Sequence, residues 1–179
     1  MIFNVILLVI IVFLLVCLSM IWPPDSPWAP WWRTSKTVAR HMCRLAKIGK
    51  KDIIYDLGSG DGTALITAAK EFGAKGVGIE IDPLRVFLSK LFVRFAKVDD
   101  KITIVKNNFF VVDISKATVV FVYLVPKALM RLKKKMFTEL KPGTKIVSYK
   151  YAIDFLSLAV SDKQRKIFVY KIPQKKETA

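Results

Sequence analysis

Histidine and cysteine are scarce in this chain of 179 residues, which has one histidine, His41, and two cysteines, Cys17 and Cys43. The cysteines form no CxxC pair, and no His or Cys cluster surrounds His41 in the sequence. Metal sites are built from such clusters, so the sequence predicts no metal site. Both cysteines are interpreted as small apolar residues. A P-loop is excluded as well, because no Gly-Lys-Ser or Gly-Lys-Thr follows a glycine-rich turn.

Acidic side chains are in the minority. The chain has 30 Lys and Arg against 14 Asp and Glu, a formal net charge of +16. This bias favours an anionic partner, such as lipid headgroups, nucleic acid or an acidic protein, or simply a solvated basic surface. A basic stripe recurs at helical spacing, at Lys127, Arg131, Lys134 and Lys135. No aromatic residues interleave it, so the sequence favours a solvated helix face and does not predict a nucleic-acid partner.

Charged side chains are absent from residues 1–22, where Ile, Leu, Val and Phe dominate. A run of that length can cross a bilayer core of about 30 Å as a helix. A cleaved signal peptide is the alternative, but no basic segment precedes the run and Pro23-Pro24 stands where a cleavage site is expected. The sequence therefore predicts a transmembrane helix over residues 1–22, followed by a linker rich in Pro and Trp over 23–34.

Basic residues follow this run and none precedes it, with Arg33, Lys36 and Arg40 the first of them. The positive-inside rule then places the N-terminus outside and the rest of the chain in the cytoplasm. We therefore predict a single-pass protein of the cytoplasmic membrane.

Strand and helix patterns alternate over residues 35–173, which we interpret as one α/β domain before a disordered tail over 174–179. Helices are predicted over 36–46, 63–72, 83–95 and 126–140, and strands over 52–56, 76–81, 102–106, 118–124, 145–151, 155–160 and 165–172. Repeated βα units predict a Rossmann-like, mostly parallel sheet with helices on both faces. The last two strands predict an antiparallel C-terminal hairpin.

A glycine-rich turn, DLGSGDG at residues 56–62, follows the first predicted strand. Glycines allow the backbone to turn sharply and to approach a ligand closely. The next strand ends in Glu80, where a carboxylate can accept hydrogen bonds from ribose hydroxyls. A nucleotide-type cofactor site is favoured over the alternative, a strand–turn–helix whose glycines only make the turn.

The details of this turn distinguish between cofactors. A dinucleotide fingerprint needs its third glycine one residue later than Gly62, and position 63 is threonine. Asp56 and Asp61 would be repelled by a pyrophosphate. They suit a cofactor that has a positive charge and no phosphate, such as S-adenosyl-L-methionine.

Class I, seven-strand S-adenosyl-L-methionine-dependent methyltransferases carry a motif I and an acidic strand end that resemble IIYDLGSGDGTALITAAKEFGAKGVGIEIDP. A narrower family consists of small protein-lysine methyltransferases, both the archaeal broad-specificity enzymes and the mitochondrial enzymes that modify the ATP-synthase c-subunit. Its N-terminal proline-aromatic segment and first helix resemble PWAPWWRTSKTVARHMCRLAKI. Its later motifs are similar to NNFFVVDISKATVVFVYL and ELKPGTKIVSYKYAI. The resemblance covers about residues 27–153.

The resemblance implies roles for the residues that match these motifs. The cofactor-binding residues implied are Asp56, Gly58, Ser59, Gly60 and Gly62 around the methionine part, Glu80 at the ribose, and Ile81, Asn108 and Phe109 at the adenine. Tyr123 and Phe109 would line the channel of the acceptor, with Trp28 and Tyr149 as further candidates. An amine that enters such an apolar channel has its pKa lowered by desolvation, which helps to expose its lone pair.

The predicted function is a membrane-anchored methyltransferase that modifies lysine side chains of a protein, with a membrane protein among the candidate substrates. An NPPY-type tetrad is missing after the fourth strand, which argues against planar amides and base amines as acceptors. Two alternatives stay open. One is a methyltransferase that acts on a lipid or another membrane small molecule, and the other is a non-catalytic, cofactor-binding scaffold with a basic docking surface.

Overall fold

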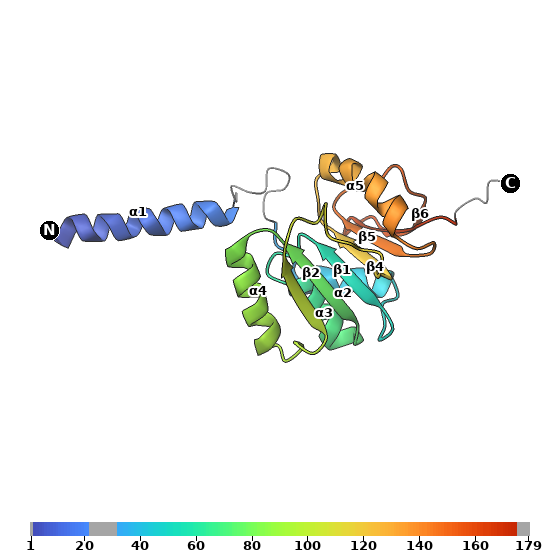
Figure 1. Ribbon diagram of the computed structural model, residues 1–179, viewed down its shortest axis with the longest axis horizontal. Helices are drawn as coiled ribbons and strands as arrows, with labels where there is room; N and C mark the ends of the chain where they lie inside the picture. The colour runs from blue at the N-terminus through green and yellow to red at the C-terminus, as the bar shows by residue number, and fades with distance from the viewer. Residues whose placement is uncertain (1, 22–31, 175–179) are drawn as a thin grey trace.

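The computed structural model of the chain describes residues 2–21 and 32–174, without the side chains of residues 19–21 (Figure 1). The helices are α1 (Ile2–Ile21), α2 (Lys36–Leu45), α3 (Thr63–Phe72), α4 (Pro83–Phe95) and α5 (Pro126–Glu139). The strands are β1 (Ile53–Leu57), β2 (Lys75–Glu80), β3 (Ile102–Lys106), β4 (Val119–Val122), β5 (Lys145–Tyr149), β6 (Leu158–Asp162) and β7 (Ile167–Lys171). Most of the predicted linker and tail lies outside the described residues, so the predicted domain boundaries stay predictions.

One sheet contains the seven strands of residues 32–174, in the order β3-β2-β1-β4-β5-β7-β6. Strands β1 to β5 pair in parallel, while β7 is antiparallel to both β5 and β6. The predicted Rossmann-like sheet with a C-terminal hairpin is confirmed. Its order reverses between β1 and β4, and in open α/β sheets that reversal creates a ligand crevice at the carboxyl ends of the strands.

Two apolar cores lie on the two faces of this sheet. Helices α2, α3 and α4 pack on one face, and α5 packs on the other with residues 109–117. Side chains alternate between these faces along a strand. Ile54 therefore joins the core beneath α3, while its neighbour Tyr55 joins the core beneath α5. The predicted placement of helices on both faces is confirmed.

Local sequence signals account for the helix boundaries next to the crevice. Asp82 caps α4 by accepting a hydrogen bond from the Arg85 amide at 2.8 Å, and Pro83 begins the helix with a residue that needs no amide partner. Gly62 and Gly73 bracket α3, both in the left-handed region that favours glycine.

The hairpin begins later than predicted, because strand β6 covers Leu158–Asp162 and not residues 155–160. The apolar residues just before it serve a different purpose. Ile153 and Leu156 are buried in the core beneath α5, and the Ile153 amide donates to the Tyr170 hydroxyl at 2.9 Å. The first residues of the predicted strand therefore belong to a loop that packs into the core.

The structure corrects the prediction of a transmembrane helix. The apolar run does form helix α1, over Ile2–Ile21. Within residues 2–21 and 32–174, no helix combines the length and apolar character needed to cross a membrane. The predicted transmembrane segment and the single-pass localisation are therefore contradicted.

Candidate functional site

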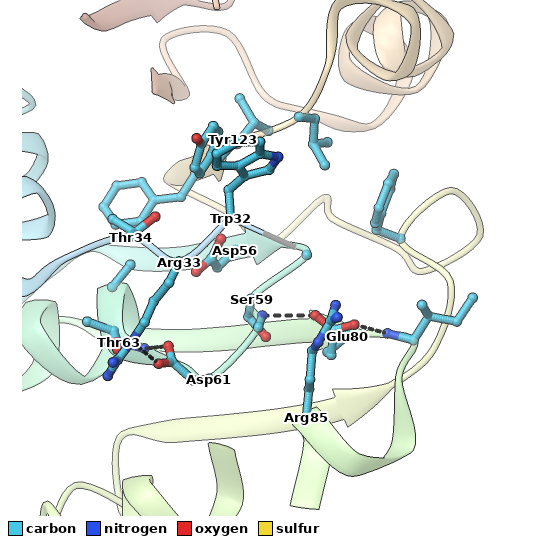
Figure 2. Close-up of a pocket in the computed structure, with 18 of the residues that line it drawn as sticks. Trp32, Arg33, Thr34, Asp56, Ser59, Asp61, Thr63, Glu80, Arg85 and Tyr123 are labelled. Atoms are coloured by element: carbon cyan, nitrogen blue, oxygen red, sulfur yellow. Dashed lines mark hydrogen bonds and ion pairs between the residues drawn. The ribbon is translucent and has the colours of Figure 1, made fainter. Parts of the chain in front are cut away.

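A pocket of about 800 Å³, its open mouth included, lies at the carboxyl ends of β1, β2 and β4 (Figure 2). The glycine turn after β1, the end of β2 and the segment after β4 contribute to its walls. Residues 32–34, which precede α2, close another side. The pocket therefore occupies the crevice where the order of the parallel strands reverses.

The glycine turn after β1 has a backbone that glycine adopts more easily than other residues. Gly58, Gly60 and Gly62 have φ angles of 87°, 54° and 77°. The amides of Gly58 and Ser59 both donate to the Ile79 carbonyl, at 2.9 and 3.1 Å, which ties the turn to β2. The turn is thus held against the strand that carries Glu80.

Glu80 is 5% exposed, and its carboxylate is oriented by backbone amides. Oε1 accepts from the amides of Ile81 and Asp82 at 2.9 and 3.0 Å, and Oε2 accepts from the Gly60 amide at 2.9 Å. A carboxylate has about four acceptor positions, so these three bonds leave one for a ligand hydroxyl. This geometry fits the recognition of a ribose.

Asp56 is buried at the end of β1, and no hydrogen bond to its carboxyl group is present among the described residues. Burial raises its pKa from 3.8 to about 7, and the negative charges of Glu80 and Asp61 act in the same direction. A cationic group bound beside Asp56 would relieve both effects by favouring the ionised form. The carboxyl group is therefore suited to the amino group of a cofactor.

Asp61 lies on the same turn but has partners within the chain. Its Oδ2 is 2.6 Å from Nε of Arg33, and its Oδ1 accepts from the Thr63 amide at 3.0 Å (Figure 2). Arg33 thereby joins the segment before α2 to the glycine turn. The Arg33 side chain is 62% exposed, so this ion pair is expected to contribute less to stability than to the position of the turn.

Two further polar residues line the pocket. The Ser59 hydroxyl has no hydrogen-bond partner among the described residues and is buried next to Gly78 of β2. Arg85, at the start of α4, is 5% exposed; burial lowers its pKa, while the charge of Glu80 has the opposite effect. Asp56, Glu80 and the glycine turn together fit S-adenosyl-L-methionine.

The structure brings most of the predicted site residues together. Those that line the pocket are Asp56, Gly58, Ser59, Gly60, Glu80, Ile81, Phe109 and Tyr123. Gly62 does not line it but is the N-cap residue just before α3. Asn108 is exposed outside the pocket, and its Oδ1 accepts from the Phe110 amide at 2.9 Å. Trp28 lies outside the described residues.

Pocket-lining residues that were not predicted from the sequence include Trp32, Arg33, Thr34 and Arg85. The first three belong to the segment that resembles the family's N-terminal motif, so that resemblance was a usable signal for them. Arg85 follows Asp82-Pro83 and had no such signal. Its burial depends on how α4 packs against the sheet.

The chain that forms this pocket is similar in sequence to several known proteins. Residues 56–158 match the family described as the ANTKMT methyltransferase domain. A protein-lysine N-methyltransferase of Saccharolobus islandicus (strain REY15A) is 44% identical over 131 residues, which are 73% of this chain and 80% of that protein. The ATP synthase c-subunit lysine N-methyltransferase of Xenopus laevis is 27% identical over 68% of this chain, and the match spans 53% of that longer protein.

A solved structure is also similar. The RNA methyltransferase from Salinibacter ruber, in complex with S-adenosyl-L-homocysteine, has a TM-score of 0.77 and 36% sequence identity. The match covers 83% of this chain and 98% of that one.

Proposed function

We propose that this chain, which belongs to the ANTKMT methyltransferase domain family, transfers methyl groups to lysine side chains of a protein. It is an S-adenosyl-L-methionine-dependent methyltransferase, and the predicted cofactor is confirmed by the family match and by the product bound to the Salinibacter ruber structure. Relatives that are named as lysine methyltransferases support lysine as the acceptor.

On the cofactor side, each proposed contact follows from a described geometry. Asp56 would accept from the amino group of the cofactor, because its buried carboxyl group has no donor among the described residues. Glu80 would bind the ribose through its remaining acceptor position. When bound, the cofactor supplies a methyl group that is activated by an adjacent sulfonium.

On the acceptor side, the chain has to align an amine, exclude water and favour its neutral form. The observation that carries the proposal is that Trp32 and Tyr123 line the same pocket as Asp56 and Glu80 (Figure 2). Aromatic walls desolvate an amine and thereby lower its pKa. They also pack along the aliphatic stem of a lysine. Phe109, which lines the pocket as well, would extend this apolar surface.

RNA is the alternative acceptor that the name of the Salinibacter ruber protein suggests. The basic stripe on α5 gives it little support, because Arg131 and Lys135 of this stripe interact within the chain. The Arg131 guanidinium lies 4.2 Å from the centre of the Phe110 ring, and Lys135 Nζ lies 2.7 Å from Glu139 Oε1. Both interactions compete with phosphate binding, so we favour a protein acceptor.

The experiment is a transfer assay with the full chain and methyl-labelled S-adenosyl-L-methionine. Host proteins, total RNA and lipid vesicles are offered separately, and labelled protein is hydrolysed to identify methyl-lysines. Label in methyl-lysine is the expected result. Label that runs with RNA or lipid would overturn the proposal, and so would transfer to no fraction by protein that binds the cofactor.

A matched pair of variants connects that result to the pocket. Glu80→Gln removes the charge that the ribose would contact, and it should abolish transfer by weakening cofactor binding. Asp100→Asn makes the same kind of change at an exposed residue and should transfer as wild type does. Equal activity of the two variants would contradict the assignment of Glu80.

A further inference from the structure

One ammonium group of the chain is surrounded by aromatic rings. Lys150 follows β5, and its Nζ lies 4.7 Å from the ring centre of Trp32, 5.2 Å from that of Tyr123 and 5.9 Å from that of Tyr149. Each distance is within the roughly 6 Å at which a cation is attracted to a ring face. Trp32, Tyr123 and Tyr149 therefore form an aromatic cage around an alkylammonium ion.

This cage is continuous with the cofactor pocket. Two of its walls, Trp32 and Tyr123, also line the pocket, and Figure 2 shows them next to each other above Asp56. The third wall, Tyr149, packs against Tyr123 edge-on, with ring centres 4.7 Å apart, and does not line the pocket. The cage thus lies at the aromatic end of the pocket.

The backbone holds Lys150 in this position. Its φ angle is 67°, in the left-handed region that side chains other than glycine, asparagine and aspartate rarely adopt. The Lys150 amide donates to the Lys166 carbonyl at 2.8 Å, which fixes the end of β5 to the hairpin. The side chain is therefore presented to the rings from a fixed backbone.

The charge state of Lys150 suits a bound cation and not a methyl acceptor. A hydrogen bond from the ammonium to the Tyr123 hydroxyl raises the pKa of Lys150, and this effect exceeds the opposing effect of burial. An amine has to lose its proton before it can attack a methyl group. In this arrangement Lys150 therefore stays protonated and does not react, and an acceptor lysine that enters as an ammonium ion reacts only after desolvation in the pocket has favoured loss of its proton.

We propose that the cage of Trp32, Tyr123 and Tyr149 is the subsite that receives the acceptor lysine, and that Lys150 fills it until a protein lysine displaces it. This inference rests on the proposed function. The chemical identity of the two groups supports it, because Lys150 and a protein lysine present the same butylammonium chain to the same rings. Lys150 thus competes with the acceptor. The apparent affinity for the acceptor is the intrinsic affinity multiplied by the fraction of time for which the cage is free of Lys150.

Kinetics on poly-L-lysine test the competition directly. Lys150→Met keeps an unbranched chain and removes the charge, so the KM for poly-L-lysine should fall about two- to ten-fold, with kcat and cofactor affinity unchanged. Lys150→Arg keeps a cation over the rings and should behave as wild type does. Lys163→Met removes a charge from an exposed lysine and controls for general repulsion of a cationic polymer.

A second variant tests the cage itself. Tyr149→Leu removes the wall that does not line the pocket, so it should raise the KM for poly-L-lysine and leave the affinity for S-adenosyl-L-methionine unchanged. A KM in Lys150→Met that equals that of Lys163→Met, or that exceeds wild type, would overturn the inference.

A binding measurement separates this inference from the proposed function. Nuclear magnetic resonance titration with n-butylammonium chloride needs no turnover, so it reports on the cage even if no lysine is methylated. Tighter binding to Lys150→Met than to wild type, weakened again in Lys150→Met/Tyr149→Leu, is the expected order. Equal binding to wild type and Lys150→Met would contradict the cage, whereas absent transfer alone would contradict only the proposed function.

Discussion

Replacing Asp56 by asparagine should stabilise the chain at neutral and alkaline pH while it weakens cofactor binding. In the folded chain the pKa of Asp56 is raised from 3.8 to about 7, chiefly by burial, and then by Glu80 and Asp61. The folded state therefore holds a proton that the unfolded state has already released. Each pKa unit corresponds to 1.36 kcal/mol, so ionised Asp56 costs the folded state on the order of 4 kcal/mol above pH 7.

The sign and the pH window follow from the two pKa values. Between about pH 4 and pH 7 the folded state binds more protons at Asp56 than the unfolded state does, so this contribution to stability falls as pH rises. Above pH 7 both states are ionised and the contribution is constant. Between pH 5 and pH 8, wild type should therefore lose roughly 3 kcal/mol relative to Asp56→Asn.

Urea unfolding of the cofactor-free chain at pH 5 and pH 8 measures this difference. Other carboxylates titrate alike in both proteins, so their effects cancel in the comparison. Asp100→Asn is the control and should show no such pH-dependent difference from wild type. Calorimetry should show weaker binding of S-adenosyl-L-homocysteine to Asp56→Asn. If its stability advantage over wild type is the same at both pH values, the electrostatic account of the pocket is wrong.

Two further substitutions have expected outcomes. In Gly78→Ala the new Cβ would lie 2.7 Å from both Ser59 Oγ and Ile104 Cδ1, so the glycine turn has to shift. We expect a loss of about 1–3 kcal/mol in unfolding free energy, measured by urea unfolding, and weaker cofactor binding, measured by calorimetry. Unchanged binding would contradict the role of the turn. Tyr170→Phe removes the acceptor of the buried Ile153 amide. The free energy of unfolding in urea should fall by about 1–3 kcal/mol, with cofactor affinity unchanged. A loss of affinity would show that the loop after β5 shapes the pocket.

The parts of the site that could be predicted are those encoded by neighbouring residues. A strand, a glycine turn and a helix follow one another in the chain, and parallel βα topology brings the ends of β1 and β2 to one edge of the sheet. Asp56 and Glu80 could therefore be placed in one crevice before the structure was known.

Asn108 shows where that reasoning ends. The sequence places it just after β3, at the correct edge of the sheet. Its side chain instead bonds the amide two residues ahead, as asparagine does in turns, and it lies outside the pocket. Position along a strand predicts the edge that a residue reaches, but local hydrogen bonds decide the direction of its side chain.

The apolar N-terminal run shows a similar limit. Its composition correctly predicts a helix, since α1 covers Ile2–Ile21. The further prediction that this helix crosses a membrane is contradicted, because no helix in the described part of the chain meets the requirement of length and apolarity. Apolar composition thus predicts the helix but not how the helix relates to a membrane.

The sequence by itself determined the fold class, the cofactor, and the place of Asp56 and Glu80 at one edge of the sheet. Periodicity and glycine spacing act over short stretches of chain, so they can be read without the fold. Only the tertiary structure decided the rest of the pocket. Trp32, Tyr123 and Lys150 come from three distant segments, and nothing in their local sequence predicts that they meet. The pKa of Asp56 likewise depends on burial and on two acids brought close by the fold. Desolvation and long-range contacts arise only when the elements pack.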